Sequence, residues 1–340
     1  MRVAIYGAGA IGCFLAARLA RCCEVTLIAR GATLAALQTH GLRLEEADGT
    51  SQVIRVRAVA DSHEAGQQDY VFLTVKAQQA SQVAAQLAPL YDDTTAVLPA
   101  INGIPWWYFQ QVQGDLAGTR LRSVDPDGFL MRTIPAERLI GCVVYPAATV
   151  VEPGWVRHME GERFVLGELH GEATDRVRTL SQVMGRCGLK APVRKDIRAE
   201  IWVKLWGNLA LNPLSVLTMA TMDVMLADPG VRAVCQHMMT EAEQVAAALG
   251  VRMPVDMETR LRGAQQVGAH RTSMLQDLLA GRSLELDAIL GAVVELAHVV
   301  AVPAPMCAAI LALTALRASQ GMDALMPNQG SQDAPVAHGN

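Results

Sequence analysis

The chain has 340 residues, of which 51% are hydrophobic and 18% charged, and its formal net charge is −4. A chain of this length is expected to form two domains of roughly 100–200 residues each. The slightly acidic charge argues against partners that need a basic surface, so we expect neither nucleic acid nor a membrane as a partner.

Cysteine and histidine usage points away from disulfides and metals. The seven cysteines are scattered without CxxC spacing, and the eight histidines form no HxxxH or HExxH pattern. We therefore expect no metal site and a reducing compartment. The apolar stretch from Ile289 to Leu316 is interrupted by Glu295, His298 and two prolines, so no transmembrane helix is expected. The sequence favours a cytoplasmic protein.

The first third of the chain alternates short apolar runs with helical patterns. In chain order we expect strand Arg2–Tyr6, helix Ile11–Arg21, strand Val25–Ile28, strand Tyr70–Val75, helix Ser81–Leu90 and strand Thr95–Leu98. This alternation predicts βαβ units and a parallel sheet. The stretch from Leu139 to Leu169 is strand-like, and we interpret it as an extension of the same sheet.

Strand signals end near Val193–Lys195, which we interpret as a hinge, and helical patterns fill the chain from Ile197 to about Ser319. The predicted fold is an α/β Rossmann-type dinucleotide-binding domain over residues 1–194, followed by an all-α domain over residues 195–325. Residues 326–340 are expected to be a disordered tail.

A glycine-rich loop joins the first strand to the first helix. In Gly7-Ala8-Gly9-Ala10-Ile11-Gly12, the first glycine permits a tight turn and the second lets the backbone approach a pyrophosphate. The third allows the helix to pack closely on the strand, and the amides at the helix start, including those of Ala10 and Ile11, favour phosphate. A glycine-rich turn without a ligand is the alternative.

The end of the second strand indicates which dinucleotide is bound. An NAD site would place Asp or Glu there, roughly 20 residues past the glycines. This chain has Ala29-Arg30 instead, and an arginine pairs well with a 2′-phosphate. NADPH is favoured, with a solvated surface arginine as the alternative.

Two polar residues follow later strands of the predicted sheet. Lys76 follows the run that ends at Val75, and Asn102-Gly103 follows the strand that ends at Leu98. Ligands of open α/β sheets lie at this edge. Taken singly, Lys76 could extend to water and Asn102-Gly103 could be an ordinary turn.

Four of the chain's fifteen aromatic residues stand side by side in Trp106-Trp107-Tyr108-Phe109. A lid or a cleft wall, a core plug and a dimer contact are alternatives for this run.

A polar stripe marks the first long helix of the second half. Lys204, Asn208 and Asn212 are spaced by four in a segment that is otherwise apolar. A buried helix keeps such a stripe only where it faces water, a polar network or a cleft. Asparagine is a poor helix former, which favours a cleft over a solvated face.

A second polar group follows in Ser273, Asp277 and Glu285. Ser273 and Asp277 share a face if their helix is continuous. Taken alone, a helix-capping serine and a solvated acid would explain them.

Together these residues resemble the ketopantoate reductase family, NADPH enzymes that make pantoate on the route to pantothenate and coenzyme A. The resemblance extends from Met1 to about Ala318 and includes the glycine loop with Arg30, Thr74–Lys76, Asn102-Gly103, Lys204 with its two asparagines, and Ser273 through Asp287. It implies an NADP-binding Rossmann-type domain and an all-α domain of the 6-phosphogluconate dehydrogenase C-terminal type.

The resemblance also implies a role for each site residue. Lys204 is the general acid that protonates the ketone oxygen of a small 2-oxo acid, and Glu285 bonds the new hydroxyl and holds Lys204 in line. Lys76 and Asn102 lie at the nicotinamide ribose and the cleft floor. The substrate's oxygens are bound by a further group of residues, which consists of Asn208, Asn212 and Ser273, with Asp277 in support.

Departures from the family pattern leave the substrate open. Ile101 stands where the family usually has glutamine, and the Trp106–Phe109 run is not typical. Reduction of another 2-oxo acid or an imine is one alternative, and an NADP(H)-binding regulatory protein without catalysis is another. The helical half could also support a homodimer.

Overall fold

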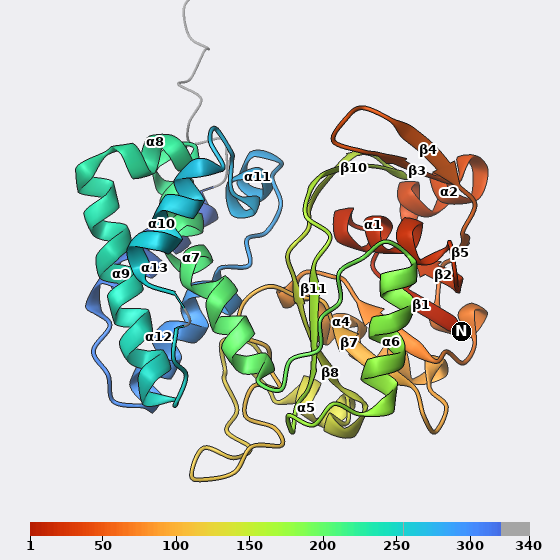
Figure 1. Ribbon diagram of the computed structural model, residues 1–340, viewed down its shortest axis with the longest axis horizontal. Helices are drawn as coiled ribbons and strands as arrows, with labels where there is room; N and C mark the ends of the chain where they lie inside the picture. The colour runs from red at the N-terminus through yellow and green to blue at the C-terminus, as the bar shows by residue number, and fades with distance from the viewer. Residues whose placement is uncertain (254, 321–340) are drawn as a thin grey trace, which may run out of the picture.

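A computed structural model describes residues 1–253 and 255–320, and the expected tail over residues 326–340 lies outside them. Figure 1 shows the sheets gathered in one half of the molecule and the later helices in the other, with α7 starting at the boundary. No helix among the described residues is long and apolar enough to cross a membrane.

A five-stranded parallel sheet forms the base of the first half, in the order β5-β2-β1-β6-β7. Its strands are β1 (Arg2–Tyr6), β2 (Glu24–Ile28), β5 (Arg57–Val59), β6 (Tyr70–Leu73) and β7 (Ala96–Pro99). β1, β2, β6 and β7 were expected from the sequence, whereas β5 was missed. The short segment after β6 is split into the 3₁₀ turns η1 (Ala77–Gln79) and η2 (Ala85–Leu90) around α4 (Ala80–Ala84), because Pro89 interrupts the expected helix.

The strands from Leu139 to Leu169 do not extend this sheet, contrary to expectation. β9 (Ala147–Glu152) and β10 (Trp155–Glu160) join β3 (Leu42–Glu45) and β4 (Ser51–Ile54) in a second sheet. β8 (Ile140–Val144) and β11 (Phe164–Glu168) form a third, which lies beside β7 and is linked to it by the bridge of Val97 and Leu139.

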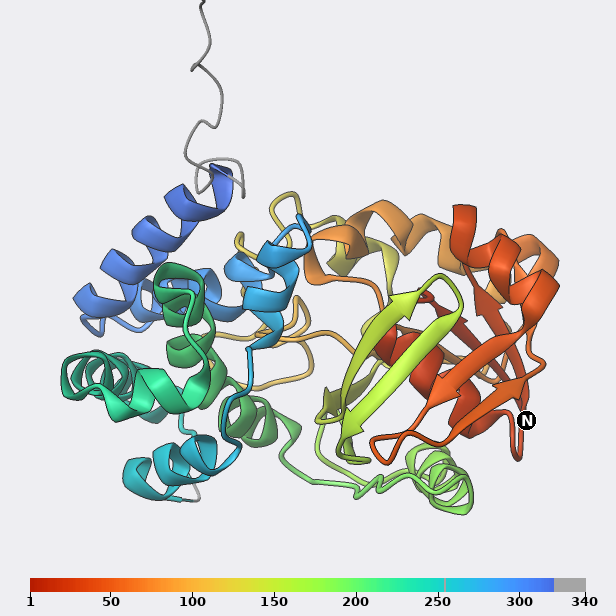
Figure 2. The ribbon, with the colours of Figure 1, turned by 90° about the horizontal axis from the view of Figure 1, so that it is seen from above.

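The physical reason for the second sheet is the helix α1 (Ala10–Leu19). Its residues from Gly12 to Leu19 are all buried, so one sheet cannot cover it. The strands β3, β9 and β10 pack against its other side, and Figure 2 shows β9 and β10 passing across it. α1 therefore lies between two sheets, which fixes its N-terminus.

The remaining helices complete both halves. The first half adds α2 (Gly31–His40), α3 (Ser62–Ala65), α5 (Phe129–Thr133), the 3₁₀ turn η3 (Ala136–Arg138) and α6 (Asp175–Arg186). The second half consists of α7 (Ile197–Thr218), α8 (Met222–Ala227), α9 (Pro229–Ala248), α10 (Met257–Gln266), α11 (Ser273–Leu279), the π-helix η4 (Asp287–Gly291), α12 (Ala292–Val299) and α13 (Pro305–Ser319). As expected, the described part of this half is helical.

One hydrophobic core runs through both halves and joins them. It includes Val97 and Leu139 from the sheets and Trp202 and Trp206 from α7. Above it, the loop after β7 touches η4, where the Ile104 amide donates to the Ala288 carbonyl at 2.8 Å. The halves are therefore held in register close to the expected cleft.

Gly103→Ala is expected to lower the free energy of unfolding by more than about 2 kcal/mol. Gly103 has φ +86°, and a Cβ there would lie 2.2 Å from the Ala288 carbonyl oxygen. Gly49→Ala is the matched control, because Gly49 has φ +85° but no atom within 4 Å of such a Cβ. The control should lose only about 1 kcal/mol in denaturant titration, and equal losses would show that the contact with η4 is unimportant.

Candidate functional site

The glycine loop has the geometry that its sequence predicts. Gly7 has φ +117°, which a residue with a side chain rarely adopts, and its amide donates to the Ile28 carbonyl. A Cβ at Gly12 would lie 1.9 Å from the Gly7 carbonyl oxygen and 2.6 Å from Thr74 Oγ1. The first and third glycines are thus required by the turn and by the packing of α1 on the strands.

Gly9 is different, because a Cβ there would meet no protein atom within 4 Å. Gly9 occupies the N-cap of α1, no side chain accepts a hydrogen bond from the helix start, and the first turn carries no acidic residue. The amides at Ala10 and Ile11 stand at the positive end of a ten-residue helix. This donor set fits the pyrophosphate of a dinucleotide.

Arg30 lies just past β2, at the N-cap of α2. Its guanidinium donates to Tyr6 Oη at 3.2 Å and to Gln86 Oε1 at 2.7 Å. Tyr6 Oη also donates to Gln86 Oε1. These neutral partners hold the exposed guanidinium without neutralising it, so its charge is left for an anionic group.

Lys76 joins the edge of the parallel sheet to the helical half. Its Nζ donates to Asp277 Oδ2 at 2.6 Å and to Glu285 Oε2 at 3.3 Å. Burial alone would lower the pKa of Lys76, but Glu285 and Asp277 outweigh it and raise that pKa. Both carboxylates are buried, and Asp277 also accepts from Arg282 Nε at 2.9 Å. Asp277 is therefore part of a charged network and not a solvated acid.

Asn102 links this network to Lys204. Its Nδ2 donates to Glu285 Oε2 at 3.1 Å, while its Oδ1 accepts from Lys204 Nζ at 2.6 Å. Glu285 was expected to hold Lys204 in line, and the hydrogen bonds that link the two residues run through Asn102. Glu285 is held by the amide of Ala77 as well, at 3.2 Å from its Oε1.

Lys204 combines a hydrogen-bonded ammonium with an apolar setting. Burial lowers its pKa to about 8, although the nearby negative charge of Glu285 acts in the opposite direction. Lys76 adds a repulsion that lowers the pKa further. The amine therefore titrates close to neutral pH, which suits a group that gives and takes a proton.

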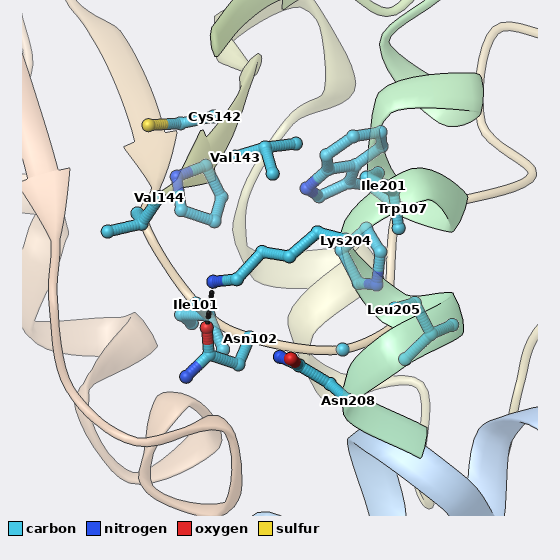
Figure 3. Close-up of a pocket in the computed structure, with 13 residues that line it drawn as sticks. Ile101, Asn102, Trp107, Cys142, Val143, Val144, Ile201, Lys204, Leu205 and Asn208 are labelled. Carbon is cyan, nitrogen blue, oxygen red and sulfur yellow. Dashed lines mark hydrogen bonds between the residues drawn. The ribbon is translucent and has the colours of Figure 1, made fainter. Parts of the chain in front are cut away.

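A small pocket lies beside Lys204. Figure 3 shows the Lys204 side chain crossing it to reach Asn102, with Asn208 on the same side. The other walls are mostly apolar, and they come from the loop after β7, from β8 and from α7. The pocket is lined by Pro99, Ile101, Asn102, Gly103, Pro105, Trp107, Cys142, Val143, Val144, Ile201, Lys204, Leu205 and Asn208.

The remaining expected substrate residues are not among those that line this pocket. Asn212 is only 4% exposed, and its Nδ2 has no hydrogen-bond partner among the residues that the structure describes. Ser273 is exposed in the first turn of α11. The helix cap is not Ser273 but Thr272, whose Oγ1 accepts from the Leu275 amide. Asn208 and Lys204 are thus brought together at the pocket, whereas Asn212 and Ser273 are not among its lining residues.

Two features of the site were only partly predicted from the sequence. A cleft wall was one of the alternatives for the aromatic run, and Trp107 of that run lines the pocket. Gly103 was interpreted as a turn residue, whereas its close approach to η4 requires glycine. The unusual density of aromatic residues was the available signal for the first, and the second had none.

Comparisons with known proteins agree with the fold. Residues 3–171 match the family model described as Ketopantoate reductase PanE/ApbA, and residues 196–318 match Ketopantoate reductase PanE/ApbA C terminal. The chain is 51% identical over 315 residues to the 2-dehydropantoate 2-reductase of Mesorhizobium japonicum, covering 92% of this chain and 96% of that one.

Solved structures are similar along nearly the whole chain. A candidate ketopantoate reductase from Ralstonia solanacearum MolK2 is 44% identical with a TM-score of 0.89, covering 94% of this chain and 98% of that one. A PanE/ApbA family ketopantoate reductase from Ralstonia eutropha JMP134 is 28% identical with a TM-score of 0.81, covering 94% and 99%.

Lys76→Met is expected to destabilise the protein by about 1–3 kcal/mol at pH 7, because two buried carboxylates lose the ammonium that bonds both of them. The range extends down to about 1 kcal/mol because the Lys76 side chain is 33% exposed, so that solvent screens part of its charge. Because the pKa of Lys76 is raised, the ammonium stabilises the fold throughout neutral pH, and this contribution is lost only as the pH rises through that raised value.

The loss of stability in Lys76→Met should become smaller in acid, where the carboxylates are protonated and need no counter-charge. Denaturant titration of the wild type and the variant at several pH values measures this loss. The matched control is Lys190→Met, since Lys190 is 77% exposed and 3.9 Å from Glu162. A deficit that is independent of pH, or equal in the control, would contradict a charged network.

Proposed function

Because the chain belongs to the ketopantoate reductase family, we propose that it reduces 2-dehydropantoate to pantoate with NADPH, and that Lys204 supplies the proton. The chain is an oxidoreductase of the 2-dehydropantoate 2-reductase class, and it acts on a small 2-oxo acid with a nicotinamide dinucleotide cofactor. The observation that carries the proposed mechanism is the Lys204 ammonium, bonded to Asn102 at the edge of an apolar pocket.

The cofactor's part is limited to one chemical step, which is the supply of a hydride to the ketone carbon. Gly9, Ala10 and Ile11 would hold its pyrophosphate through backbone amides at the start of α1. Gly7 and Gly12 shape that loop. Arg30 would pair with the 2′-phosphate, since Tyr6 and Gln86 orient its guanidinium without neutralising it.

Lys204 stabilises the negative charge that develops on the ketone oxygen of the substrate. Addition of hydride turns the ketone oxygen into an alkoxide, and a nearby ammonium stabilises this charge before it donates its proton. Burial strengthens the attraction because little water screens it. A pKa near 8 also makes the proton easier to release than that of an ordinary lysine.

Glu285 is proposed to act on the proton donor through Asn102. By accepting from Asn102 Nδ2, it leaves Asn102 Oδ1 facing Lys204 Nζ, so the ammonium is aimed into the pocket. The resemblance adds a second role for Glu285, which is a hydrogen bond to the new hydroxyl. Lys76 neutralises part of the Glu285 charge and so limits its pull on the proton of Lys204.

The carboxylate end of the substrate is proposed to meet Asn208, Asn212 and Ser273. Asn212 supports this assignment with a buried Nδ2 that lacks a partner within the described residues. Asp277 contributes indirectly, because it holds Lys76 and Arg282 at this edge of the cleft.

A second candidate is the reduction of another small 2-oxo acid. Ile101, which replaces the family's usual glutamine, lines the pocket with an apolar side chain. The regulatory alternative without catalysis is disfavoured, because a binding protein needs no buried, hydrogen-bonded ammonium beside its pocket.

Localisation and assembly form the remaining part of the proposal. A cytoplasmic setting is supported by seven free cysteines, five of which are buried. A homodimer is supported by α13, where Leu313 and Leu316 are 54% and 57% exposed.

Among a panel of 2-oxo acids, 2-dehydropantoate is expected to give the highest kcat/KM, measured as NADPH oxidation. Lys204→Ala should lower its kcat by about 10²–10⁴-fold while NADPH still binds. The wild-type kcat/KM should also fall about tenfold per pH unit above pH about 8, because the acid must be protonated.

The residual activity of Lys204→Ala should lack this alkaline decline. Nearly full turnover by the variant would contradict the role of Lys204 as proton donor. Preference for a different 2-oxo acid would favour the second candidate, and the absence of turnover across the panel would favour the regulatory protein.

Arg30→Ala should raise the KM for NADPH by roughly 10–100-fold and change that for NADH by less than about threefold. The reason is that only NADPH carries the 2′-phosphate. Arg55→Ala is a suitable control, because Arg55 is an exposed arginine of the same half, and among the described residues it bonds only the Thr39 carbonyl. Equal weakening of both cofactors would remove the case for a 2′-phosphate contact.

A further inference from the structure

The aromatic run after Asn102 is buried along its whole length. Trp106, Trp107, Tyr108 and Phe109 are between 1% and 4% exposed. Tyr108 Oη accepts from Trp202 Nε1 at 2.8 Å, and the Tyr108 carbonyl accepts from Arg198 Nε at 2.7 Å. The run therefore packs between the sheets and α7, as part of the core that joins the two halves.

Trp107 differs from its neighbours because it also lines the pocket. Its Nε1 is buried and has no hydrogen-bond partner within residues 1–253 and 255–320. Figure 3 shows the indole on the same wall as Ile201, with its nitrogen turned toward Val143 and the stem of Lys204. The ring is held from behind, since a Cβ at Gly141 would lie 3.0 Å from Trp107 Cη2.

This N–H is a polar group in a wall that is otherwise apolar. The lining side chains are mostly apolar, and within the described residues none of them accepts a hydrogen bond from this N–H. A buried donor without a partner is unfavourable, so a ligand oxygen that accepts from it is favoured over a ligand that places carbon there. A pocket of apolar side chains alone would discriminate poorly between the two.

We propose that the Trp107 indole N–H is a specificity-determining donor, and that it recognises a hydroxyl on the branch of the substrate beyond the ketone. The inference rests on the proposed function and deepens it. Lys204 meets the ketone oxygen, the apolar wall seats the branched carbons, and Trp107 selects 2-oxo acids whose branch ends in an oxygen acceptor. A branch that ends in an ammonium is rejected, because an indole N–H cannot accept a hydrogen bond.

The test compares two substrates that differ by one hydroxyl. 2-Dehydropantoate carries it, and trimethylpyruvate has a methyl group in place of the hydroxymethyl group. Wild-type enzyme should prefer 2-dehydropantoate in kcat/KM by at least about 10-fold. Trp107→Phe keeps an aromatic ring but removes the N–H, so it should lower kcat/KM for 2-dehydropantoate by roughly 10–100-fold and that for trimethylpyruvate by less than about threefold.

Trp106→Phe is the matched control. Trp106 Nε1 is also buried without a partner in the described part of the chain, but Trp106 does not line the pocket. This variant should leave the ratio of the two kcat/KM values unchanged. The KM for NADPH and the unfolding midpoint of each variant separate a lost contact from a damaged fold.

Equal losses for the two substrates in Trp107→Phe would overturn the proposal, because they indicate packing alone. No loss for either would overturn it too. If Trp107→Phe does not fold, the wild-type ratio decides, since a ratio near one excludes recognition of the hydroxyl. Reduction of both substrates with a ratio near one leaves the proposed function standing, whereas no reduction of 2-dehydropantoate removes both.

Discussion

The proposed active site depends on keeping the ammonium group of Lys204 charged beside an apolar pocket. Lys204 would lose its proton more readily if its only surroundings were the hydrophobic core, since burial opposes charge. The Asn102 oxygen and the field of Glu285 counter that effect without reversing it, and the amine is left with a pKa near 8. Lys204 can release its proton near neutral pH because these contacts offset only part of the effect of burial on its pKa.

The residues that stabilise the Lys204 ammonium come from both halves of the molecule. Lys76 and Asn102 follow strands β6 and β7, whereas Lys204, Asp277 and Glu285 belong to the helical half. The network that links them is continuous, from Lys204 through Asn102 and Glu285 to Lys76. The site therefore exists only where the two halves are docked, and the shared core together with the close contact of Gly103 with η4 secures that docking.

Local patterns were enough to predict the parts of the site that act on their own. The glycine loop needs only its strand and helix, and the stripe of Lys204 and Asn208 needs only helical spacing. The sequence did not predict which of these side chains bond one another. Lys76 and Asp277 are 201 residues apart, and Lys204 and Asn102 are 102 residues apart. The second sheet was missed for a similar reason, since the complete burial of α1 becomes visible only when β9 and β10 are placed on it.

Direct titration of the Lys204 side chain tests the central claim most closely. In protein labelled at the lysine ε-carbons, the NMR signal of Lys204, assigned by its absence from a Lys204→Arg variant, should report a pKa near 8. Replacement of Asn102 by alanine should lower it further, because the ammonium then loses its hydrogen-bond acceptor. A Lys204 signal that titrates near 10.5, as an exposed lysine does, would contradict the account.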